Sequence, residues 1–108
     1  MTLSLRPSAL LGPDWYILQA DGSDIFPGLG GSKHEWCKLT YAMACWEQGT
    51  TQLFTGRRIA VYVNDNGVYF WDPHNEPATH PPEDERTRFR VAHSAIPDLA
   101  TAIEAAFK

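Results

Sequence analysis

The chain has few of the features that mark secreted, membrane-spanning or disulfide-stabilised proteins. Two of its 108 residues are cysteine, which is too few for a disulfide scaffold. No stretch approaches the roughly 20 apolar residues that span a bilayer. The first residues lack a basic segment followed by an apolar run, so we expect no secretory signal. These absences predict a cytoplasmic protein whose two thiols stay reduced.

Positive charge is also scarce. Nine Lys and Arg residues stand against thirteen Asp and Glu, and the net charge is −4. This sign disfavours binding to a phosphate backbone, so we expect neither a nucleic-acid partner nor a membrane partner. Hydrophobic residues make up 44% of the chain and aromatic residues 12%, which suffices for one core. We therefore expect a single domain over residues 1–108.

The first third of the chain predicts one strand between irregular segments. Residues 1–13 show no clean period and predict an irregular lead-in. Residues 14–20 form an aromatic and branched run that ends at Asp21 and Gly22, which is typical of a strand and a turn. The residues that follow predict a glycine-containing loop that leads into a helix.

A helix is predicted over residues 33–48. Ser32 and Glu35 have the spacing of a capping box, and Gly49 is a natural stop. Apolar residues recur at helical spacing and form one stripe, namely Trp36, Leu39, Met43 and Trp46.

The second half predicts strands followed by a helix. A tight turn at Asn66 and Gly67 joins two of the strands in a hairpin. Ser94 is expected to cap the last helix, with Pro97 in its first turn. The expected strands cover residues 51–55, 57–64, 68–71 and 87–92. The whole pattern predicts an α+β fold: a mainly antiparallel sheet of about four to five strands with a central hairpin, packed by two helices.

One thiol has a setting that suits catalysis. Cys37 lies in the first half of the predicted helix, where the helix dipole favours a thiolate. Cys37 is followed by the rest of the helix, by Gly49 and by strands, the last of which leads to Asp72 and Pro73. In this order, residues 32–76 resemble the core of transglutaminase-like and papain-like cysteine enzymes. The resemblance implies that Cys37 is the nucleophile of an acyl-transfer reaction and that Asp72 orients the base. The expected histidine is missing, because its place holds Arg57 or Arg58, and an arginine cannot act as a base.

Structural roles explain the same residues. Cys37 beside an apolar stripe is commonly a small buried hydrophobe, and an Asp-Pro pair commonly begins a turn. The two cysteines, eight residues apart on one helix, lie about 12 Å apart, beyond the roughly 7 Å limit for a disulfide. The four histidines lack metal-ligand spacing, so we expect no metal and no cofactor.

The long segment after Asp72 predicts a recognition loop. Residues 72–86 hold four prolines, which lower the cost of ordering the loop against a partner. We expect this loop to offer acidic contacts; a solvated run of charge is the alternative. Arg86, Arg88 and Arg90 form a basic ridge beside it. The expected acidic contacts are Glu76, Glu83, Asp84 and Glu85. The candidates for an aromatic anchor, if any lies outside the core, are Trp71, Trp46 and Tyr69.

These features favour a small stoichiometric inhibitor that occludes a site on a target protein. Such proteins include toxin-immunity and phage anti-defence proteins. The alternative is a cysteine-dependent acyl-transferase or amide hydrolase that uses Cys37 and Asp72, or a catalytically dead relative of one. An assembly subunit is a third possibility, and its first sign would be self-association.

Overall fold

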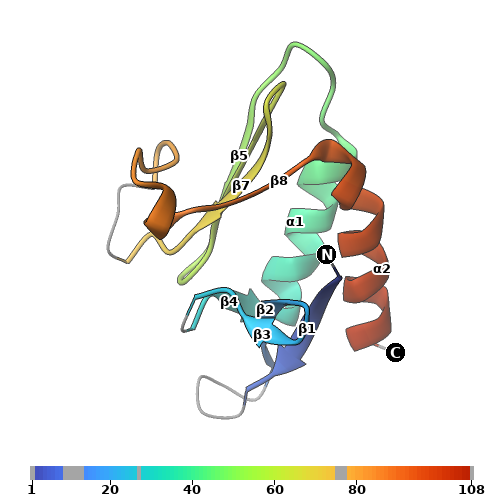
Figure 1. Ribbon diagram of the computed structural model, residues 1–108. Helices are drawn as coiled ribbons and strands as arrows, with labels where there is room; N and C mark the ends of the chain where they lie inside the picture. Colours follow the sequence, from blue (N-terminus) through green and yellow to red (C-terminus); the bar gives the residue numbers. More distant parts are fainter. Residues whose placement is uncertain (1, 9–13, 27, 75–77, 108) are drawn as a thin grey trace.

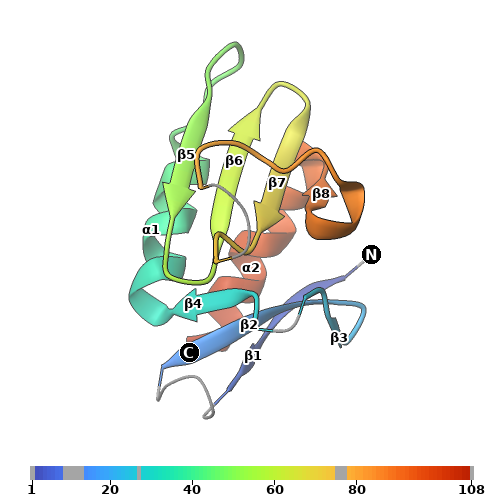
Figure 2. The ribbon, with the colours of Figure 1, turned by 90° about the vertical axis from the view of Figure 1, so that its left-hand side faces the viewer.

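The fold is α+β, as predicted, in a computed structural model that describes residues 2–8, 14–26, 28–74 and 78–107. These residues form two α-helices and two four-stranded antiparallel sheets in place of the single sheet of four to five strands that we expected. The two helices lie side by side against one face of the second sheet, and the first sheet closes one end of the molecule (Figures 1 and 2). No helix in the described part of the chain is long and apolar enough to cross a membrane.

Sheet A comes from the N-terminal third of the chain. Its central strand pairs with β1 along one edge and with β3 and β4 along the other. Residues 3–7 thus form a strand, not the irregular lead-in that we predicted, because five alternating residues are too few to reveal a period. The strands are β1 (Leu3–Pro7), β2 (Trp15–Ala20), β3 (Ser23–Asp24) and β4 (Gly30–Ser32).

Helix α1 (Lys33–Ala44) begins as the sequence predicts. Ser32 is the N-cap: its hydroxyl accepts from the Glu35 N–H at 3.2 Å, and Glu35 Oε1 accepts from the Ser32 N–H at 3.2 Å. The helix ends four residues earlier than predicted. The chain turns there, and the Trp46 indole donates to the Thr50 carbonyl at 3.1 Å.

Sheet B contains the predicted hairpin. Its turn lies one residue earlier than we expected, because Asn64 pairs with Gly67 and the turn residues are Asp65 and Asn66. The positive φ that a tight hairpin needs occurs at Gly67, at 138°, and not at Asn66. The strands, in spatial order, are β5 (Gln52–Thr55), β6 (Ala60–Asn64), β7 (Gly67–Trp71) and β8 (Phe89–Val91).

Helix α2 (Ile96–Ala106) follows a short 3₁₀ turn, η2 (His93–Ala95). Pro97 lies in its first turn, as predicted. The predicted Ser94 cap is wrong: Ala95 is the N-cap residue and makes no side-chain cap bond, because Ser94 belongs to the 3₁₀ turn.

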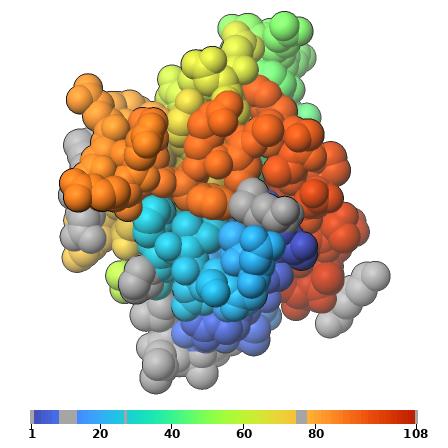
Figure 3. Space-filling model, in the orientation of Figure 1, coloured from blue at the N-terminus to red at the C-terminus, as the bar shows by residue number. Residues whose placement is uncertain are grey.

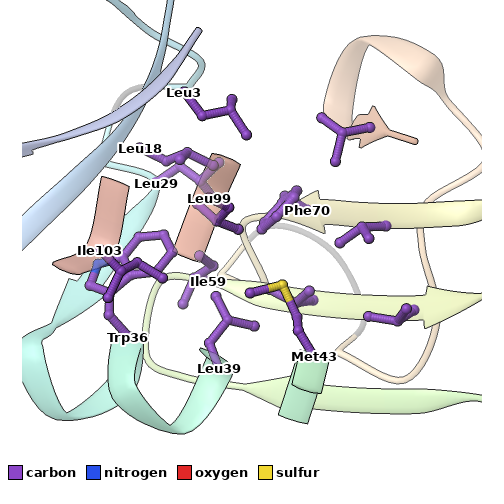
Figure 4. Close-up of a cluster of buried hydrophobic side chains, with 14 residues drawn as sticks. Leu3, Leu18, Leu29, Trp36, Leu39, Met43, Ile59, Phe70, Leu99 and Ile103 are labelled. Carbon is purple, nitrogen blue, oxygen red and sulfur yellow. The ribbon is translucent and has the colours of Figure 1, made fainter. Parts of the chain in front are cut away.

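The core lies between the helices and both sheets. Trp36 and Leu39 of α1, Leu99 of α2, Leu18 of sheet A and Phe70 of sheet B meet in one cluster of buried side chains (Figure 4). A bridge between Gly30, at the start of β4 in sheet A, and Arg58, just before sheet B, links the backbones of the two halves. The helices therefore leave the opposite face of sheet B outside this core.

Candidate protein-binding face

The outer face of sheet B carries a row of side chains that crosses all four strands. Because side chains alternate along a strand, those between the core positions of β6 and β7 face away from the helices. The register sets Leu53 opposite Tyr62, Tyr62 opposite Tyr69, and Tyr69 opposite Arg90. We call these four residues the Leu53–Arg90 row.

The middle of this row is held by ring contacts. The rings of Tyr62 and Tyr69 lie 6.4 Å apart at 66°, an edge-on arrangement. The Arg88 guanidinium lies over the Tyr69 ring at 5.6 Å. Both tyrosines are half-buried, and Leu53 is 44% exposed at the edge of the sheet. Tyrosine and arginine thus lie on a rigid sheet with one side open to solvent.

The loop before β8 crosses the same face. Residues 78–84 pass in front of the strands (Figure 2) and protrude at one side of the molecule (Figure 3, orange). Pro82 is buried, and its carbonyl accepts from Arg88 Nη1 at 3.0 Å. Trp71 pairs with Ala60 on this face, and both are fully buried. The prediction of Trp71 as an exposed anchor is therefore wrong, because the outer face is covered at that end of the strands.

Two acidic residues of the loop, Asp84 and Glu85, lie beside arginines. Asp84 Oδ1 accepts from the Arg86 N–H at 2.9 Å, and the two side chains form an ion pair at 3.1 Å. These hydrogen bonds lower the pKa of Asp84. Glu85 lies 3.9 Å from Arg88, and Glu83 is exposed. Beside the row lies a rim that carries both charges, because the predicted acidic contacts and two arginines of the predicted basic ridge lie together.

Sequence reasoning named Tyr69 but missed Leu53 and Tyr62. A turn at Asn66 and Gly67, as we expected, would have set Tyr62 opposite Trp71. The one-residue shift of the turn sets it opposite Tyr69 instead. Glu76, also expected to contact a partner, lies outside the described residues.

Asp72 has structural partners. Its side chain is 13% exposed and pairs with Arg58 at 3.5 Å, and its Oδ1 accepts from the His74 N–H at 2.9 Å. Two positions that the enzyme resemblance pairs, Arg58 and Asp72, are thus neighbours. Arg58 cannot replace the missing histidine as the base, because arginine stays protonated.

Cys37 lies on the solvent side of α1. The expectation that it is a small buried hydrophobe is wrong, since the residue is exposed. Glu35 Oε2 accepts from the Arg57 N–H at 3.1 Å, so that flank of α1 faces the chain before β6. Cys37, two residues further on, lies about 160° around the helix from Glu35. The thiol therefore faces away from the segment that leads to Arg58.

A groove of about 530 Å³ lies between β1 and α2. Its described lining consists of small, hydroxyl and apolar residues, and Asp98 is its one titratable side chain. No group of three metal-binding side chains occurs in the part of the chain that the structure describes. The described lining of the groove thus holds no histidine, cysteine or basic side chain beside Asp98, so the Leu53–Arg90 row remains the strongest candidate site.

Comparison of the chain with protein-family models, with curated proteins and with solved structures finds no match.

Proposed function

We propose that the protein is a small stoichiometric inhibitor that binds a target protein through the Leu53–Arg90 row and occludes its site. The ring contact of Tyr62 and Tyr69 in this row, with the guanidinium of the neighbouring Arg88 over the Tyr69 ring, carries this proposal. Tyrosine and arginine dominate binding energy in protein interfaces, and side chains already fixed on a sheet lose little entropy on binding. Toxin-immunity and phage anti-defence proteins act in this way.

The charged rim sets the rate of association. Glu83, Asp84 and Glu85 are exposed beside the row and meet cationic groups of the target during approach. Changing all three to lysine should slow association and reduce its dependence on salt. Unchanged kinetics with an identified target would remove residues 83–85 from the interface.

The row is tested by two substitutions and a matched control. The target is first captured from an extract of the source cells with the immobilised protein, and its affinity is measured by calorimetry. Leu53→Glu and Tyr62→Ala should each weaken binding about thirtyfold, which corresponds to about 2 kcal/mol for a side chain that the target buries. Ala105→Glu places the same charge on exposed α2 and should leave binding unchanged. The reverse result would move the interface to the groove beside α2.

A titration separates inhibition from catalysis. The activity of the captured target should fall linearly and reach its minimum at one molecule of inhibitor per target. Cys37→Ala should inhibit as well as the parent chain, because the thiol takes no part in the row. Loss of inhibition in Cys37→Ala, or inactivation by a trace of protein, would support the cysteine enzyme instead.

A further inference from the structure

The solvent face of α1 carries two thiols with a tyrosine midway between them. Cys37, Tyr41 and Cys45 are exposed, and Tyr41 is 74% exposed. Cys45 is the C-cap residue and keeps a helical backbone, with its N–H donating to the Tyr41 carbonyl at 3.0 Å. Residues four apart form a ridge on a helix. We call these three residues the Cys37–Cys45 ridge.

The two thiols of one chain lie too far apart to join each other. Eight residues of helix span about 12 Å, and a disulfide needs Cα atoms within about 7 Å. Their spacing is symmetric about Tyr41, however. A two-fold axis at Tyr41 would bring Cys37 of each copy opposite Cys45 of the other.

Helix packing allows the required approach. Helices packed against each other have their axes about 8–10 Å apart. Because Cα atoms lie about 2.3 Å from the axis, Cα atoms that face each other directly come within about 3.4–5.4 Å. That distance overlaps the disulfide range of about 4.4–6.8 Å.

The charges on this face of α1 are complementary between two copies that pair antiparallel. His34 and Lys38 are exposed in the first half of α1, whereas Lys33 Nζ lies over the Phe107 ring of α2 at 5.5 Å. The last turn has no basic residue, and the exposed Glu47 follows it. An antiparallel pair sets the basic half of each helix against the negative C-terminal end of the other.

We propose that two copies of the chain pair antiparallel through this ridge, and that oxidation by a small-molecule disulfide joins Cys37 of each copy to Cys45 of the other. In each link two thiols lose their hydrogens and form one S–S bond, while one molecule of oxidised glutathione is reduced to two molecules of glutathione. The ridge is thus a redox-sensitive self-association surface, separate from the outer face of sheet B.

The test is a complementation between single variants. The parent chain, treated with oxidised glutathione, should form a covalent dimer whose linked peptides join Cys37 to Cys45. Cys37→Ser and Cys45→Ser should each stay monomeric alone, and an equal mixture of the two should form the dimer. Both positions are exposed, so serine leaves the fold intact, which circular dichroism checks.

Three results would overturn the proposal. One is dimers of a single variant that form as fast as those of the mixture. Another is linked peptides that join like cysteines. The third is glutathione adducts on the parent chain without dimers. Tyr41→Glu should slow cross-linking at least tenfold, because it sets two carboxylates face to face on the axis, whereas Leu53→Glu should not change it. The Leu53→Glu control keeps this result independent of the inhibitor proposal.

Discussion

Sheets A and B are both antiparallel and four-stranded in the described chain, yet different forces hold their strands together. Sheet B buries branched and aromatic side chains from β6, β7 and β8 in the core. In sheet A, β3 has two exposed residues and β4 is Gly-Gly-Ser, so neither adds a large side chain to the core. Sheet B is therefore stabilised by apolar burial, whereas the second edge of sheet A depends on close backbone fit and surface polar contacts. We therefore expect sheet B, and not sheet A, to present a rigid outer face.

The largest effect should come from removing a ring from sheet B. Phe70 is fully buried among residues of both sheets and both helices (Figure 4). Phe70→Ala should lower the free energy of unfolding by about 3–5 kcal/mol, because it removes apolar contact and leaves a cavity. Urea denaturation measures this. A loss under 1 kcal/mol would show that sheet B does not depend on this burial.

The next effect should come from adding one methyl group to sheet A. A Cβ at Gly30 would lie 2.1 Å from the Tyr16 carbonyl oxygen, which is backbone and cannot turn aside. Gly30→Ala should therefore push β4 from β2 and cost about 3 kcal/mol, the upper range for overpacking. Hydrogen exchange should show the loss first at β4 and at the bridge to Arg58.

Gly49→Ala is the matched control. Gly49 has a φ of +85° and nothing within 4 Å of the added Cβ, so only backbone strain of about 1 kcal/mol is expected. If Gly49→Ala proved the more costly of the two, close approach would not be what holds β4.

The same contrast explains what the sequence could predict. Local sequence patterns predict sheet B, namely alternating residues such as Val61 and Val63 and the turn glycine Gly67. Strand β4 has no such signal, because two glycines fit a strand only where another backbone comes close, and Tyr16 lies fourteen residues away in sequence. The candidate face was hidden for a related reason. Its row depends on the register of three strand pairs, which a shift of one residue in a turn rearranges.

A smaller effect is expected at the junction of the two sheets. Glu35 closes the capping box through Oε1 and accepts from the Arg57 N–H through Oε2. Glu35→Gln keeps one acceptor and turns the other into a donor, so one of the two N–H groups loses its partner. We expect a loss of about 1 kcal/mol in thermal unfolding. Glu104→Gln, on exposed α2, should change stability by much less; equal losses would mean that Glu35 does not act through these bonds.

The smallest effect concerns two exposed carboxylates, one in each region. Arg6 donates to Asp24 at 2.8 Å and lowers its pKa below 3.8, with Gln19 adding a second bond. Arg86 does the same for Asp84 in the loop over sheet B.

Both pKa values are lower in the folded chain, so each pair stabilises the fold above the unfolded pKa and loses this effect as the pH falls through the folded value. A titration followed through the NMR shifts of the carboxyl carbons should give a pKa below the ordinary 3.8 for both Asp24 and Asp84. Arg6→Met should return Asp24 toward 3.8 and leave Asp84 unchanged. If both values moved together, the shifts would come from the overall charge of the protein and not from the local pairs. Solvent screens both carboxylates, so each ion pair contributes little to the free energy of unfolding. Asp24→Asn should therefore change the loss of stability at acidic pH only slightly.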